Sequence, residues 1–411
     1  MMRAWIRRHR FVLLAAAAVS LAALVVFLPI VSFVVGQEVD YGYHLYYITQ
    51  LVNGQPAAEF IARVPHFGYH AGVVLVYELL PDLSLEGAAV IVSLGYYVLE
   101  GLAALLVLAL LGGEPKSLAA ALLYTAATLS LLLVMPINLL TPDNLILGYI
   151  PANVYYNPTM LTLKPYAVLL FLCAALAFQP VLRRRVPLPL VGMITVGCIL
   201  AKPSYIIALL PALAAETVCV RWRRRPVDWR TLVWGIGLPA GVMLTIQFGL
   251  FRGTGFYFAP LAMLNEVGAR INPAAPQNLG LKFALSILFP AAVYLFNWRR
   301  ALRCPALNLA WLTFFAGAAY MYLLAEGGER LGHANFRWSA QSAVFVLFIV
   351  SAGFFIERSR HLLNERRLLS LPVCAFVAGA VIFGLHVVSG LNWYTIHVNA
   401  VWMGDIITNL W

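Results

Sequence analysis

Acidic and histidine side chains stand close together near the N-terminus. Glu38, Asp40 and His44 lie in residues 36–54, which follow a long apolar stretch. A carboxylate beside an imidazole can take a proton from a substrate hydroxyl, so Asp40 is the leading candidate for a general base. If residues 40–53 form a helix, Asp40 and His44 share one face. An N-cap is the alternative role of Asp40, and the two roles are compatible.

Tyrosine and asparagine side chains precede a lysine in a second segment. Tyr155, Tyr156 and Asn157 come shortly before Lys164, which lies at the start of an apolar stretch. Tyr and Asn suit sugar stacking and hydroxyl binding, and Lys164 can bind a phosphate. In the alternative reading, this is a Pro-punctuated loop whose Tyr and Lys anchor at a membrane interface. As a group, these residues favour a binding surface.

Lys202 is a lone charge between two apolar stretches. Charges in or near a membrane are costly and usually have a partner or a function. An ammonium at the bilayer edge can neutralise a phosphate group. A lysine that snorkels from a helix end is the alternative.

The segment 326–338 is the most polar of the stretches that the predicted topology places outside the cytoplasm. In a helix, Glu326, Arg330, His333 and Arg337 would form one stripe. Both arginines can bind a phosphate bidentately, and Glu326 or His333 can orient them. The glycines in this segment weaken a helix, so a solvated charged loop is the alternative.

Metal chemistry has little support in the sequence. His66 and His70 are four residues apart, but no second His or Cys cluster follows them. This spacing alone is a weak indication of a divalent metal, and the five cysteines suggest no thiolate site. No cofactor and no metal ligand are therefore predicted. Glu100 lies within an apolar stretch, where an acid is expected to face a partner.

These candidate residues are separated by stretches that must cross a membrane. Hydrophobic residues make up 62% of the chain and charged residues only 11%, which excludes a water-soluble fold. The net charge of +11 comes from short Lys and Arg clusters between apolar stretches, so it does not indicate nucleic-acid binding.

The apolar stretches predict an all-α, polytopic transmembrane protein with about eleven helices and one domain over residues 1–411. The first outer loop, 36–86, is expected to hold juxtamembrane helices. Residues 40–53 should be amphipathic and lie flat on the membrane, and 69–80 should be interfacial or re-entrant. The predicted spans are 11–35, 87–111, 117–136, 161–179, 186–201, 204–220, 230–251, 281–297, 307–325, 339–356 and 370–389.

The distribution of Lys and Arg predicts the orientation of these spans. With residues 1–10 in the cytoplasm, most of the basic residues fall in inner loops, as the positive-inside rule requires. The long, polar loops and the tail 390–411 then face outward. We therefore expect a multi-pass protein of the cell (inner or plasma) membrane with an active site on its extracytoplasmic face.

In this arrangement the chain resembles the GT-C superfamily of membrane glycosyltransferases. The resemblance lies in a first helix, a long first outer loop with an acid at Glu38 or Asp40, an amphipathic juxtamembrane helix and a multi-helix body. It implies a polyprenyl-phosphate-linked sugar donor and a catalytic acid, a role that falls on Asp40 with Glu38 as substitute. The chain lacks the acid pair and aromatic motifs of the protein-glycosylating members, which favours a lipid or glycan acceptor.

The sequence is compatible with three classes of function. The first is an inverting glycosyltransferase in which Asp40 is the base and outer cations hold the departing phosphate. The second is an O-antigen-type polysaccharide polymerase or ligase that relies on Arg330 and Arg337. The third is a lipid or solute transporter, which should show repeats and charges near the midplane. Polar residues gathered at one face argue against the third class, and the loop acid together with the outer cations fits the first.

Overall fold

The regular secondary structure of this computed structural model is helical within the described residues, apart from one pair of short strands. The described residues are 2–37, 40–138, 148–178, 186–250, 255–262, 264, 276–327, 334–362 and 370–403. Every apolar stretch predicted to cross the membrane is helical, so the all-α class is confirmed. The longer helices are α1 (Met2–Val35), α5 (Leu85–Gly112), α6 (Leu118–Leu133), α7 (Pro158–Ala177), α8 (Leu188–Ala201), α9 (Ser204–Trp222), α10 (Leu238–Leu250), α12 (Leu279–Phe296), α14 (Pro305–Leu323), α15 (Arg337–Leu362) and α16 (Leu371–Met403).

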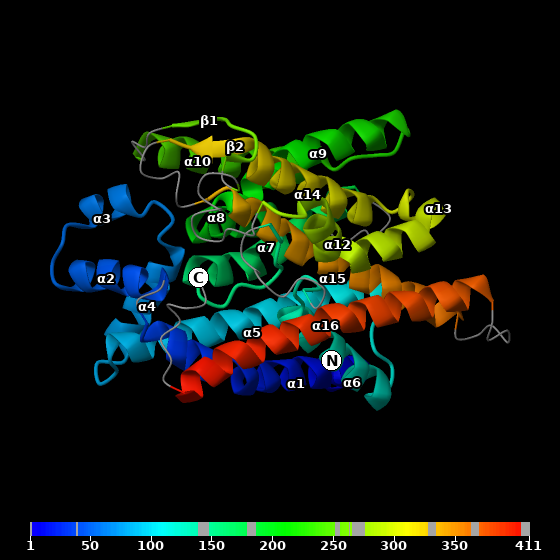
Figure 1. The fold of residues 1–411 in the computed structure, drawn as a ribbon, viewed down its shortest axis with the longest axis horizontal. Helices are drawn as coiled ribbons and strands as arrows, with labels where there is room; N and C mark the ends of the chain where they lie inside the picture. Colours follow the sequence, from blue (N-terminus) through cyan, green and yellow to red (C-terminus); the bar gives the residue numbers. More distant parts are fainter. Residues whose placement is uncertain are drawn as a thin grey trace.

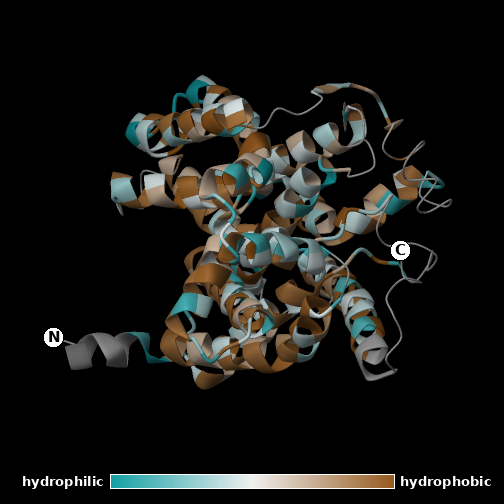
Figure 2. Ribbon diagram, turned by 90° about the vertical axis from the view of Figure 1, so that its left-hand side faces the viewer, coloured by the Kyte–Doolittle hydropathy of each residue, from teal (hydrophilic) through white to brown (hydrophobic). Residues whose placement is uncertain are grey.

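The lengths of these helices indicate a multi-pass membrane protein. Among the described residues, nine helices are long and apolar enough to cross a membrane, one of them being the π-helix η2 (Arg230–Gly237) continued by α10. Helices α6 and α8 are apolar but shorter. Figure 2 shows hydrophobic residues along the helices throughout this view of the bundle, as expected for helices that lie in lipid.

Three short helices form the segment between α1 and α5. They are α2 (Asp40–Val52), α3 (Ala57–Arg63) and α4 (Gly68–Leu79). Helix α2 confirms the helix predicted over 40–53, and its apolar Ile48 is fully buried. Helix α4 has 12 residues, too few to span a bilayer. In Figure 1, α2 and α3 lie together at the left end of the molecule.

Helices α7 and α15 form the interior of the bundle. In their most apolar windows, 78% and 83% of the residues are buried, compared with 22% for α1 and α16. Gly317 of α14 lets α15 approach closely, because a Cβ there would lie 2.6 Å from the backbone oxygen of Ser339. The side chains that α7 and α15 carry at their ends are therefore held by a close-packed scaffold.

Arginine side chains join the loops at the end opposite α2 and α3. Arg223 donates to the backbone oxygen of Leu302 at 2.7 Å, and Arg358 donates to Asn297 at 3.0 Å. The short helix α13 (Trp298–Ala301) lies at this end in Figure 1, on the right. We call it the basic end. The described parts of the predicted inner side around residues 223, 297–302 and 358 thus meet at one end of the molecule.

The two strands and the end of the last helix differ from the sequence prediction. Strand β1 (Phe256–Phe258) pairs antiparallel with β2 (Leu324–Glu326), and Phe256 is opposite Glu326. Glu326 therefore does not share a helix with Arg337, and the helical alternative for this segment is wrong in its described part. Helix α16 continues to Met403, well past the predicted end at 389.

Candidate functional site

Polar side chains from four distant parts of the sequence meet at the end opposite the basic end. They are contributed by the starts of α2, α7 and α15 and by the junction of α8 and α9. We call this group the polar cluster: Asp40, Tyr156, Asn157, Thr159, Lys202, Arg337 and Trp338.

Asn157 holds the carboxylate of Asp40 in a fixed orientation. Its Oδ1 accepts hydrogen bonds from the backbone N–H of Met160 and the hydroxyl of Thr159, both at 2.8 Å, which makes it the N-cap of α7. Because Oδ1 is the acceptor, Nδ2 must be the side that faces Asp40. It donates to Asp40 Oδ2 at 2.5 Å. One carboxylate oxygen is thus positioned, and Oδ1 of Asp40 has no hydrogen-bond partner among the described residues.

Lys202 places a cation beside this carboxylate. It ends α8, and Pro203 separates it from α9, so the break between the two helices sets its position. Its Nζ donates to Thr159 at 3.0 Å and lies 4.5 Å from the centre of the Trp338 ring. Burial lowers the pKa of Lys202 to about 8, although the nearby Asp40 carboxylate opposes this shift. A lone lysine at this position is expected to have a partner or a function, and in the structure its partners are Thr159 and Trp338.

Arg337 is the second cation of the polar cluster. Its guanidinium lies 4.2 Å from the centre of the Trp338 ring, and Nη2 donates to the Tyr156 hydroxyl at 3.3 Å. Burial raises the pKa of Tyr156 to about 12, so its hydroxyl stays protonated at neutral pH. Trp338 in turn donates to Asn335, which donates to Glu326 at 2.6 Å. The β1–β2 pair is thereby linked to the start of α15.

Buried polar atoms without a hydrogen-bond partner continue from Arg337 into the bundle. Arg337 Nε and the two polar atoms of the Gln341 amide are buried and have no hydrogen-bond partner among the described residues. Gln341 is 1% exposed. Arg337, Gln341 and Phe345 follow one face of α15 at four-residue spacing. Buried donors and acceptors without partners are costly, so they mark a position where a ligand or water would be stabilised.

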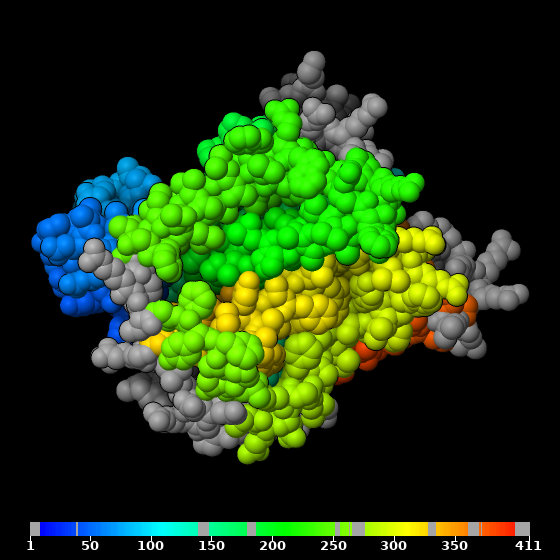
Figure 3. All heavy atoms as spheres, turned by 90° about the horizontal axis from the view of Figure 1, so that it is seen from above, coloured from blue at the N-terminus to red at the C-terminus, as the bar shows by residue number. Residues whose placement is uncertain are grey.

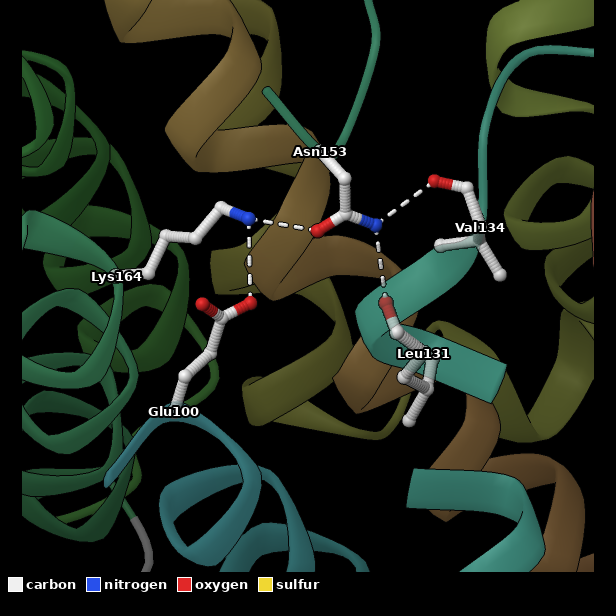
Figure 4. Close-up of polar contacts among 5 residues, drawn as sticks. All are labelled: Glu100, Leu131, Val134, Asn153 and Lys164. Carbon is white, nitrogen blue, oxygen red and sulfur yellow. Dashed lines mark hydrogen bonds and ion pairs between the residues drawn. The ribbon is translucent and has the colours of Figure 1, made fainter. Parts of the chain in front are cut away.

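A second network lies deeper, along α7 (Figure 4). Lys164 donates to Glu100 at 3.1 Å and to Asn153 at 2.6 Å, and its Nζ lies 4.5 Å from the Phe345 ring centre. Asn153 also donates to the backbone oxygens of Leu131 and Val134. Glu100 is fully buried and Lys164 is 2% exposed. Lys164 is thus the partner that the sequence analysis expected for Glu100.

His44 lies next to the polar cluster and binds another histidine. Its Nδ1 is 2.9 Å from Nε2 of His70, a contact that joins α2 to α4. Burial, with added repulsion from His70, lowers the pKa of His44 well below its usual value, and burial lowers the pKa of His70 to about 3. Both rings are therefore neutral at physiological pH. Among the described residues, no group of three or more His, Cys, Asp or Glu could hold a metal ion.

The structure brings together part of the predicted site. Asp40, Asn157, Lys202 and Arg337 meet in the polar cluster, whereas Lys164 belongs to the deeper network and His44 to the histidine pair. Glu38, Arg330 and His333 lie outside the described residues. Thr159, Trp338 and Gln341 were not among the site residues predicted from the sequence. An aromatic residue directly after Arg337 was the one available signal for Trp338.

An Asn157→Asp variant should lose stability as pH rises. Asp keeps the acceptor for the N-cap but places a second carboxylate against Asp40. The repulsion raises the pKa of the pair in the folded protein, so stability relative to wild type is kept below about pH 4 and lost above it. We expect a cost of about 2 kcal/mol at neutral pH, visible as a lower melting temperature in detergent.

The exposed Asn53 supplies the control for this variant. Asn53→Asp adds the same charge at the same end of the molecule, and its melting temperature should follow that of wild type at every pH. A melting-temperature difference for Asn157→Asp that does not vary between pH 4 and 8 would contradict the assigned contact with Asp40.

Comparison with known proteins adds no identification. No family model, no curated protein and no solved structure matches the chain. The geometry of the polar cluster is therefore the basis for a function.

Proposed function

We propose that the protein is a membrane glycosyltransferase that moves a sugar from a polyprenyl-phosphate donor to a lipid or glycan acceptor at the end that carries the polar cluster. One observation supports this most directly: a positioned carboxylate and two cations, Asp40, Lys202 and Arg337, meet beside one aromatic ring. This is the set of groups that a sugar transfer from a phosphate requires. The positive-inside rule puts this end outside the cytoplasm.

Asp40 acts as the general base in the proposed reaction. Its free Oδ1 takes the proton of the acceptor hydroxyl while that oxygen attacks the anomeric carbon of the donor. The bond between the anomeric carbon and the phosphate oxygen breaks as the new glycosidic bond forms, so the configuration inverts. The hydrogen bond from Asn157 keeps the carboxylate facing the acceptor.

Lys202 and Arg337 stabilise the polyprenyl phosphate as it leaves. The charge on the phosphate grows as the bond to the sugar breaks, and fixed cations then gain most in attraction. The partner-free Nε of Arg337 provides a further donor toward this group. Trp338 is 3% exposed, and its ring, which both cations contact, keeps Lys202 and Arg337 close together.

The leaving group is common to every donor of this class, so its binding can be tested without knowing the sugar. Purified protein in nanodiscs should bind a short polyprenyl monophosphate more tightly than the corresponding polyprenol. Lys202→Gln and Arg337→Gln should each weaken phosphate binding about tenfold or more, as expected for charged hydrogen-bond partners. Equal binding of the alcohol and the phosphate would contradict the proposal.

The polymerase or ligase class remains the second candidate because Arg337 has an unpartnered buried donor. In that mechanism arginines, and not a loop acid, carry the transfer. Transfer that survives Asp40→Asn but is abolished by Arg337→Ala would favour it. A transfer assay with polyprenyl-phosphate-linked mannose, glucose and arabinose, using wild type and both variants, separates the two candidates.

Phosphate binding should depend on the protonation of Lys202. Its amine is charged below its pKa of about 8, so we expect the dissociation constant for the polyprenyl monophosphate to increase as pH passes through 8. Lys202→Arg should remove this dependence between pH 7 and 9.5, because a guanidinium stays charged. Lys202→Gln should bind weakly at every pH. If the dissociation constant still depends on pH in both variants, the titrating group is not Lys202.

A further inference from the structure

A second surface of unusual chemistry lies at the basic end, away from the polar cluster. A groove of about 500 Å³ runs between α9, α12 and α14, and most of its lining is apolar, including Ile287, Leu312 and Phe315. Figure 3 faces this side of the molecule, where the green helix α9 borders the yellow residues of α12 and α14. The groove is wide enough for a hydrocarbon chain.

Arginines surround the basic end of this groove. A hollow of about 680 Å³ is lined by Arg223, Arg225, Trp298, Arg299, Leu302 and Arg303. Arg223 and Leu302 line both the groove and the hollow, so the two are adjacent. An apolar groove therefore lies next to a concentration of positive charge.

The local contacts hold this arrangement together. Arg223 donates to the backbone oxygen of Leu302, which fixes the end of α9 against the loop before α14. Arg299 lies 5.3 Å from the ring centre of the exposed Trp298, a residue type common at membrane interfaces. Among the described lining residues, Glu216 is the one acid, and the four arginines outnumber it. These lining residues together carry a net positive charge.

We propose that this groove binds one anionic phospholipid, with an acyl chain between α9, α12 and α14 and the phosphate on Arg225, Arg299 and Arg303. Charge complementarity selects the occupant, because a basic pocket between apolar helices matches a phosphate that carries hydrocarbon chains. A neutral lipid would leave the arginines unpaired. The site does not depend on the proposed glycosyl transfer, which takes place at the other end.

Native mass spectrometry of the detergent-purified protein tests this proposal. Titration with phosphatidylglycerol should show one tightly bound lipid, and phosphatidylcholine should not. The triple variant Arg225→Gln, Arg299→Gln, Arg303→Gln should weaken phosphatidylglycerol binding by the order of a hundredfold, from about fivefold for each cation. The matched control is Arg221→Gln, Arg224→Gln, Arg300→Gln, which removes the same charge from the same loops but not from the hollow. It should bind as wild type does.

The position of the lipid chain is tested separately. Phosphatidylglycerol with a photoreactive acyl chain should crosslink to residues of the groove such as Leu312 and Phe315, and soluble glycerol phosphate should not compete. If both triple variants bind phosphatidylglycerol equally weakly, the lipid is attracted by the overall charge and not by this site, which would overturn the proposal. Crosslinks spread over the whole apolar surface, or full competition by glycerol phosphate, would also overturn it.

Discussion

Replacement of Asp40 by Asn is expected to reduce sugar transfer by about a hundredfold to ten-thousandfold, the range that a general base contributes. Asn has nearly the same size as Asp and still offers an oxygen to the Asn157 side chain, so the start of α2 should keep its position. The variant can no longer take a proton from the acceptor hydroxyl. Binding of polyprenyl monophosphate should be retained, because Lys202 and Arg337 are unchanged. Transfer rates and phosphate affinity measured on one preparation would show this separation.

Glu59 provides the matched control for Asp40. It is an exposed acid on α3, at the same end of the molecule, so Glu59→Gln removes a charge without touching the polar cluster. This variant should transfer at the wild-type rate. A well-folded Asp40→Asn protein with full transfer activity would refute the assignment of the base.

Replacement of Lys164 by Met is expected to have the largest effect on stability. It leaves the Glu100 carboxylate fully buried without its cation, and removing one partner of a buried pair typically costs about 3–5 kcal/mol. The melting temperature in detergent should fall strongly, and the half-life at a fixed elevated temperature should shorten. Asn153 would also lose one of its bonds.

The double variant Glu100→Gln, Lys164→Met separates the loss of the ion pair from the loss of packing. With both charges removed, no ion remains uncompensated, so the double variant should be more stable than Lys164→Met alone. Lys116→Met is the control, because Lys116 is exposed at the basic end. It should melt close to wild type. Additive effects of Glu100→Gln and Lys164→Met would mean that the two side chains are not coupled.

The helices could be predicted from the sequence because they follow from composition and periodicity. Stretches of apolar residues long enough to span a bilayer must be helical, since no water satisfies their backbone. The helix over 40–53 followed from its apolar spacing and from an Asp at its start, and the structure has α2 at Asp40–Val52. Helix ends were less predictable, as α16 shows, because apolar side chains and aromatic residues continue past 389.

The contacts of the site could be predicted only in part. Lone polar residues in apolar surroundings identified Lys202 and Glu100 as residues that need partners, but a single sequence does not say which ones. Lys164 and Glu100 are 64 positions apart and meet through the packing of α5 and α7. The strand at Glu326 was missed because it depends on pairing with β1, a contact between distant segments. Gln341 gave no signal, since only its burial makes it unusual.

The first turns of α7 impose a constraint on how this protein can change through evolution. One helix carries the partners of Asp40 and Lys202, which are Asn157 and Thr159, and further along the partner of Glu100, which is Lys164. A substitution that tilts or shifts α7 therefore disturbs all three contacts together. Substitutions at these positions should therefore be strongly epistatic.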